Sequence, residues 1–176
     1  MNFPNFFAFF LLGSSHFFLA QPVAVRAQTA AVEFLGTLDS NMPESCSFSG
    51  IATGALNFEP TSKRVSSTEA AQIKAVIQPT TKYPLSKFSI KAESPSLTYK
   101  SGDDTSGEYQ NVQVNNLGIG LDVEDVDADL GVDNITFNPT SLTSDLYVGV
   151  TFITELDLED GDYRAVSSLT CFIAAS

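Results

Sequence analysis

The residues best suited to chemistry in this sequence are carboxylates in two acidic stretches of the C-terminal half, residues 122–134 and 155–162. Asp125, Asp127 and Asp129 alternate as the early ligands of a calcium-binding loop do, and calcium prefers hard oxygen ligands. The rest of that loop pattern is missing, because Leu130 stands where the loop needs a glycine and Thr136 where it needs a bidentate glutamate. The spacing excludes a helix-flanked calcium loop and leaves open either an irregular calcium site or a solvated acidic turn.

Paired carboxylates also serve glycosidases, whose mechanism of hydrolysis needs no histidine. Nothing singles out such a pair here, and the chain has no tryptophan to stack on a sugar. The one histidine, His16, lies in the N-terminal apolar region, so the rest of the chain cannot build a histidine-containing triad, a paired-histidine zinc site or histidine acid–base catalysis. We therefore expect no enzyme activity, no catalytic residue and no cofactor or resident metal.

The N-terminus has the features of an export signal. Residues 6–12 form an unbroken apolar run and residues 17–20 form a second one. Val25 and Ala27 stand at positions −3 and −1 of a cut before Gln28, which predicts a signal peptide over residues 1–27 and one mature domain over residues 28–176. A signal anchor is the alternative. The polar residues between the two apolar runs make each run much shorter than the roughly 20 residues needed to span a bilayer.

Two cysteines, Cys46 and Cys171, lie 125 positions apart. An even number of cysteines in an exported chain predicts a disulfide, with two buried free thiols as the alternative. Closing a loop of this length would stabilise the fold by roughly 5 kcal/mol on loop-entropy grounds.

The charge of the chain is negative and unevenly distributed. A formal net charge of −12 makes nucleic acid an unexpected partner, because phosphate binding needs clustered lysine and arginine. Residues 63–100 carry seven basic side chains, whereas from Ser101 onward there are fifteen acidic side chains and only one basic one, Arg164. These are either solvated faces that keep an exported protein soluble or a basic side that meets the acidic side of another copy.

Short segments of alternating apolar and polar residues, bounded by turn residues, predict an all-β fold. Their number and spacing favour an immunoglobulin-like antiparallel β-sandwich. Residues 66–77 are ambiguous, because Ser66–Glu69 has the pattern of a helix capping box, whereas the alternate apolar residues from Ala71 to Ile77 would line one face of a strand, the reading that we slightly favour. The other predicted strands cover residues 32–38, 55–58, 85–92, 117–121, 146–152 and 163–173.

Three stretches together resemble pilin subunits of chaperone–usher pili, in particular the spore coat protein U-like branch that includes the archaic biofilm-forming pili. The stretches are Val32-x-Phe34-x-Gly36-x-Leu38 ahead of Cys46, Cys46–Gly50 followed by Gly54–Phe58, and Gly161–Arg164 before the final strand. Their order brackets nearly the whole predicted mature chain.

The resemblance implies a sandwich that lacks its final strand and exposes a hydrophobic groove between its first and last strands. A periplasmic chaperone would fill the groove, and the N-terminal segment of another subunit would replace the chaperone strand at an outer-membrane usher. The implied function is that of a structural subunit of a secreted or cell-surface fibre, which passes through the periplasm and acts in adhesion, aggregation or biofilm formation. The alternative is a non-polymerising exported sandwich that binds a surface ligand or calcium. The groove edges expected from the resemblance are Val32, Phe34, Leu38, Tyr163 and Leu169.

The same resemblance places the donor segment ahead of the first strand. Cleavage before Gln28 leaves only residues 28–31 there, which are too few to fill a groove at about 3.3 Å per residue. Cleavage before Gln21 would instead leave Val23, Val25 and Ala27 on alternate positions, as a donor strand requires.

Overall fold

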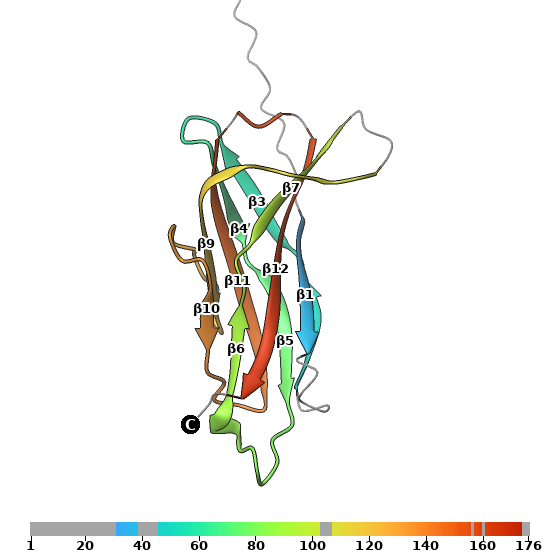
Figure 1. The fold of residues 1–176 in the computed structure, drawn as a ribbon, viewed down its shortest axis with the longest axis vertical. Helices are drawn as coiled ribbons and strands as arrows, with labels where there is room; N and C mark the ends of the chain where they lie inside the picture. The colour runs from blue at the N-terminus through green and yellow to red at the C-terminus, as the bar shows by residue number, and fades with distance from the viewer. Residues whose placement is uncertain (1–30, 39–45, 103–106, 156, 160, 174–176) are drawn as a thin grey trace, which may run out of the picture.

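A computed structural model describes residues 31–38, 46–102, 107–155, 157–159 and 161–173. It contains twelve strands, and the only helical element in the described part of the chain is a 3-10 turn, η1 (Leu85–Lys87). The fold is therefore all-β, as predicted, and its strands run along the long axis in two layers (Figure 1). No helix in the described ranges is long and apolar enough to cross a membrane. The predicted signal peptide lies outside the described residues.

The first layer is a long hairpin with two further strands beside it. Each arm of the hairpin is interrupted once, so that β2 pairs with β5 and β3 pairs with β4, all antiparallel. The next strand, β11, pairs with β5 and β4 along one edge and with β9 along the other. The strands of this layer are β2 (Cys46–Ala52), β3 (Gly54–Glu59), β4 (Arg64–Glu69), β5 (Ala71–Ile77), β9 (Val114–Asp122) and β11 (Thr143–Thr154).

The second layer is centred on the long last strand, β12. One edge of β12 pairs antiparallel with β6 and β7, and these are covered in turn by the short strands β10 and β8. The other edge of β12 pairs with β1. The strands of this layer are β1 (Ala31–Leu38), β6 (Phe88–Ala92), β7 (Ser96–Ser101), β8 (Gln110–Asn111), β10 (Ile135–Phe137) and β12 (Gly161–Ile173).

The place of β1 sets this sandwich apart from an ordinary immunoglobulin-like domain. In such a domain the last strand lies beside the one before it, in an antiparallel sheet. Here that place beside β12 is taken by the first described strand, which runs parallel to β12, and the two arrows point the same way in Figure 1. The stretch from β2 to β12 therefore forms an immunoglobulin-like sandwich without a last strand of its own.

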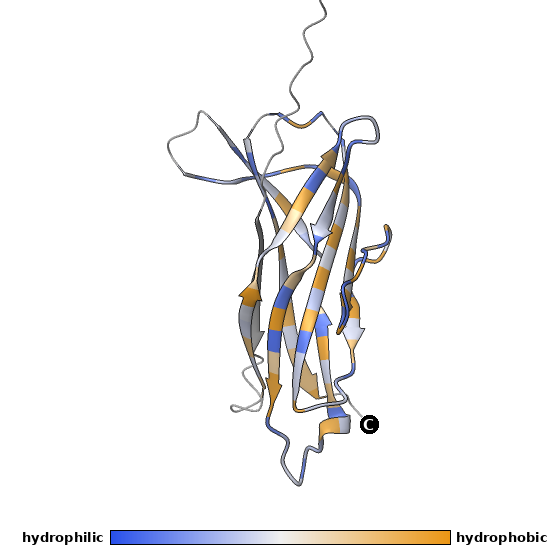
Figure 2. Ribbon diagram, turned by 180° about the vertical axis from the view of Figure 1, so that it is seen from behind, coloured by the Kyte–Doolittle hydropathy of each residue, from blue (hydrophilic) through white to orange (hydrophobic). Residues whose placement is uncertain are grey.

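The core lies between the layers and is filled by alternate residues of the strands. Figure 2 shows apolar and polar residues alternating along them. In β11 the buried apolar residues run from Leu146 to Phe152 at every second position, as predicted. In β5, Ala71, Ile73, Ala75 and Ile77 are all buried, which confirms the strand that was favoured over a helix for this segment.

The helix alternative suggested by the capping-box pattern Ser66–Glu69 is wrong, because these residues lie in β4, where Val65 is buried and the pairing with β3 and β11 outweighs local helix propensity. The strand predicted over residues 85–92 begins only at Phe88, because η1 occupies its first three residues after Pro84. The strands β2, β4, β7, β8 and β10 were not predicted, since they are short or polar and alternate weakly.

The connection from β9 to β10, residues 123–134, folds back over the outer face of β9 and β11. The N–H groups of Gly131 and Ile119 donate hydrogen bonds to the carbonyls of Leu117 and Val132, at 2.8 and 2.9 Å, along the free edge of β9. A Cβ atom at Gly118 would meet the Asp129 carbonyl, so the absence of a side chain there permits this close packing. This acidic connection is thus a strap that covers one edge of the sandwich.

Candidate functional site: the β1–β12 edge

The strand β12 presents a buried stripe to the core along most of its thirteen residues. Every second side chain is at most 4% exposed. The middle of the stripe is small, with Ala165 and Ser167, and larger side chains lie on either side of it. These buried residues are Tyr163, Ala165, Ser167, Leu169 and Cys171.

The buried hydroxyl of Ser167 is satisfied from the side opposite β1. Its Oγ donates a hydrogen bond of 2.5 Å to the carbonyl of Glu93, and the Glu93 N–H donates one of 2.9 Å to the carbonyl of Ser168. Both bonds come from the link between β6 and β7. A strand beside the other edge of β12 is therefore not needed to satisfy this polar side chain.

The pairing of β1 with β12 covers all eight residues of β1, from Ala31 opposite Arg164 to Leu38 opposite Cys171. At its start β1 also pairs antiparallel with β3, through Ala31 with Ala55 and Val32 with Gly54. The residues of β1 in register with the buried stripe of β12 are Val32, Phe34, Gly36 and Leu38, opposite Ala165, Ser167, Leu169 and Cys171 respectively.

The residues expected at the edges of a groove lie mostly on two paired strands. The predicted edges on β1 (Val32, Phe34, Leu38) and on β12 (Leu169) are not separated by a gap in this conformation, because the two strands are hydrogen-bonded neighbours. The fifth predicted edge residue, Tyr163, lies one position before the pairing begins and is opposite Tyr99 of β7. A groove lined by these residues requires β1 to leave β12, and it stays a prediction.

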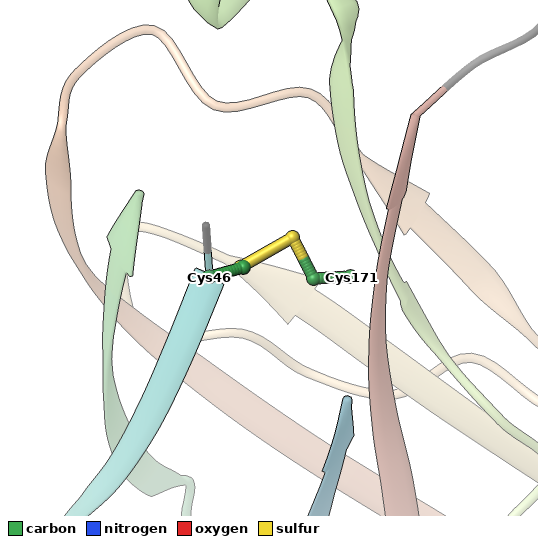
Figure 3. Close-up of a disulfide and its surroundings, with 2 residues drawn as sticks. All are labelled: Cys46 and Cys171. Carbon is green, nitrogen blue, oxygen red and sulfur yellow. A yellow bond between two sulfur atoms is a disulfide. The ribbon is translucent and has the colours of Figure 1, made fainter. Parts of the chain in front are cut away.

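A disulfide closes one end of this edge. Cys46 begins β2 and Cys171 lies near the end of β12, with their Cα atoms 6.4 Å apart and both side chains buried. Figure 3 shows the bond reaching across from one layer to the other. The predicted pairing of the two cysteines is confirmed, and the alternative of free thiols is wrong. The bond lies beside Leu38, the last residue of β1, and it fits an oxidising, exported environment.

Aromatic residues close the other end, where β12 begins. The rings of Tyr99 and Tyr163 lie 4.9 Å apart, and the Tyr163 hydroxyl donates a hydrogen bond of 2.8 Å to the Glu159 carbonyl. The Arg164 guanidinium lies over the Tyr109 ring at 4.1 Å. Because the Tyr163 hydroxyl and the Arg164 guanidinium are each held by another residue, the cluster anchors the start of β12.

The acidic residues are not gathered into a site. Asp125, Asp127 and Asp129 are exposed on the strap over β9 and β11, and no group of three histidine, cysteine or acidic residues in the described ranges is placed to hold a metal ion. The three alternating aspartates therefore do not converge on a calcium ion in this conformation, because the strap lies flat on the sheet.

Two of the basic residues in residues 63–100 form ion pairs. Lys63 forms an ion pair with Asp157 at 3.1 Å, and Lys91 forms one with Glu93 at 3.0 Å. In the connection from β5 to β6, a hydrogen bond with Tyr83 raises the pKa of the Lys82 ammonium above its usual range. A contact between a basic side and the acidic side of another copy stays a prediction.

Comparison with known proteins adds no relative to this picture. No protein-family model matches the chain, and no curated protein matches it in sequence. The resemblance to pilins consequently stays a prediction from the residues of this chain.

Proposed function

We propose that this protein is a structural subunit of a secreted or cell-surface fibre that assembles by exchange of strands between subunits, in the manner of chaperone–usher pili. The observation that carries the proposal is the position of β1, which supplies the missing last strand in parallel with β12. A strand held through main-chain bonds and alternate side-chain positions can equally be supplied by another molecule.

The resemblance places the donor ahead of residue 32, but the pairing of β1 with β12 favours a different segment. We now assign that role to β1 itself, residues 31–38. Leu38 and Cys46 both lie next to Cys171, the first by strand pairing and the second by the disulfide. Only residues 39–45 join β1 to the sandwich, so β1 can pass to another subunit without any change in the covalent order of β2 to β12.

The energetics of strand pairing give the exchange a direction. Parallel pairing is slightly less stable per residue than antiparallel pairing, so β1 of another copy that enters antiparallel to β12 would pair more strongly than the parallel β1 of the same chain. A bare edge of β12 would also be prone to aggregation. A periplasmic chaperone strand would protect that edge until an outer-membrane usher joins the subunits in a fibre for adhesion, aggregation or biofilm formation.

Electrophoresis of unheated samples tests this proposal. The full chain is exported to a bacterial periplasm, with and without a chaperone of this class, and is then concentrated under oxidising conditions. We expect a ladder of oligomers that collapses to one band on heating. The variant Leu35→Pro/Gly36→Pro should give no ladder, because proline cannot donate the bonds that hold β1, whereas Gly50→Ala on β2 should keep the ladder.

A chain that stays monomeric at all concentrations, with and without the chaperone, contradicts the fibre proposal. That outcome favours the alternative, a non-polymerising exported sandwich that binds a surface ligand or calcium.

A further inference from the structure

The disulfide divides the chain into a covalent ring and a tail. The ring runs from Cys46 to Cys171, a separation of 125 residues, and includes strands β2 to β11 with most of β12. The strand β1 is the one described strand that lies wholly outside it. The ring thus coincides with the sandwich that lacks its last strand.

On the side where β1 lies, the two layers are joined at both ends. At the start of β1, Ala31 and Val32 pair with β3 while the same strand pairs with β12, so β1 itself connects the layers. At the end of β1, the disulfide between Cys46 and Cys171 connects β2 with β12. If β1 leaves, the first connection is lost and the second remains.

We propose that the Cys46–Cys171 disulfide keeps the sandwich folded, and keeps the β12 edge in place, while the last-strand position is vacated, so that residues 31–38 of a second copy can bind there. The inference rests on the proposed function and adds a requirement to it, which is that only the oxidised subunit accepts a strand. Because β1 lies outside the ring, its departure does not diminish the restriction that the bond places on the unfolded chain.

The occupant follows from the chain itself. The edge that β1 vacates has small buried residues, Ala165 and Ser167, followed by the larger Leu169. The eight residues of β1 pair with eight residues of β12 along this edge, and in either direction β1 presents Val32, Phe34, Gly36 and Leu38 at every second position. A second copy offers the same eight residues.

Peptide binding to the full chain tests the inference. The variant Leu35→Pro/Gly36→Pro frees the β12 edge, and a fluorescent peptide with the sequence of residues 28–40 serves as the probe. We expect saturable binding by fluorescence anisotropy to the oxidised variant. Adding Cys46→Ala/Cys171→Ala to that variant should weaken binding at least tenfold, whereas a peptide of the same composition in scrambled order should bind neither protein.

Urea unfolding followed by circular dichroism separates the possible outcomes. The oxidised proline variant should keep a cooperative unfolding transition. In the variant that also lacks both cysteines, the urea midpoint should fall by more than the sum of the shifts caused by the proline pair and by the cysteine pair alone, and at the extreme the transition is lost. Equal peptide binding with and without the disulfide, additive shifts, or an oxidised proline variant that is already unfolded would each overturn the inference. A folded, oxidised proline variant that binds no peptide would instead contradict the proposed function.

Discussion

Two edges of this sandwich are closed in opposite ways. The free edge of β9 is covered by residues 123–134, the connection that directly follows it, through main-chain bonds at Leu117 and Ile119. The edge of β12 is covered by β1, which comes from the far end of the chain and lies outside the disulfide ring. The strap is joined to a strand at each of its ends, β9 and β10, so it cannot be exchanged without unfolding, whereas β1 is joined to the sandwich at one end and can be exchanged.

The packing of the two covers differs as well. The strap on β9 and β11 approaches so closely that Cβ atoms at Gly118 and Gly149 would meet its backbone carbonyls. The cover on β12 is a regular strand that uses the ordinary spacing of a sheet. The first arrangement depends on the absence of particular side chains, and the second depends on register.

The largest expected effect comes from removing the disulfide that holds the end of the β12 edge. Cys46→Ala/Cys171→Ala should lower the free energy of unfolding by about 2–5 kcal/mol, because the unfolded chain loses a constraint over 125 residues. Urea denaturation measures the change, and the wild-type protein under reducing conditions should match the variant. A loss below about 1 kcal/mol would show that the bond is not a main source of stability.

Breaking the terminal cover should cost less and act locally. Neighbouring N–H groups of a strand point to opposite edges, so Leu35→Pro/Gly36→Pro removes one N–H donor that faces β12 and displaces the pairing of the residues beside it, for which we expect a loss of about 2 kcal/mol. Amide exchange should speed up at residues 164–171 of β12, the partners of β1, and stay slow in β9 and β11. Equal acceleration at both edges would contradict the distinction between an exchangeable and a fixed cover.

Disturbing the continuous cover should have a smaller effect. Gly118→Ala places a Cβ atom against the Asp129 carbonyl, and the strap can shift in part, so we expect a loss of about 1–2 kcal/mol. Limited proteolysis within residues 123–134 should become faster while oligomer formation is unchanged. The matched control is Gly50→Ala, because no atom lies within 4 Å of the added Cβ. A similar loss for the control would argue against tight packing of the strap.

The smallest effect is expected from a substitution that lies away from both edges. Asp157→Asn removes the ion pair with Lys63, in which the Asp157 side chain is 89% exposed. Exposed pairs contribute little, so the change in stability should stay below about 0.5 kcal/mol and vanish in high salt. A larger change in urea denaturation would mean that this end of the molecule also holds the layers together.

Much of the fold was predictable because its signals are local. The alternation of Leu146 to Phe152 and of Ala71 to Ile77 has the two-residue period of a strand, whatever the partner strand is. The short elements β8 and β10 have only two and three residues, too few for a period to be recognised. In β4 polar residues on both faces conceal the strand.

The candidate site was predicted in part. Its two cysteines allowed only one intramolecular pair, so the bond between Cys46 and Cys171 was predictable without any geometry. The residues of β1 were expected to form a strand on the opposite side of a groove from β12. Their direct pairing with β12 was not expected. Alternation shows that a segment is a strand and does not show which edge it joins.

The sequence by itself determined that this protein is all-β, acidic and equipped with one cysteine pair, because composition and two-residue periodicity are properties of neighbouring residues. Only the tertiary structure decided that β1 takes the last-strand position in parallel with β12, that the disulfide encloses the sandwich without that strand, and that the alternating aspartates lie apart on a flat strap. These features arise from contacts between residues far apart in the chain, and local patterns are compatible with several such arrangements.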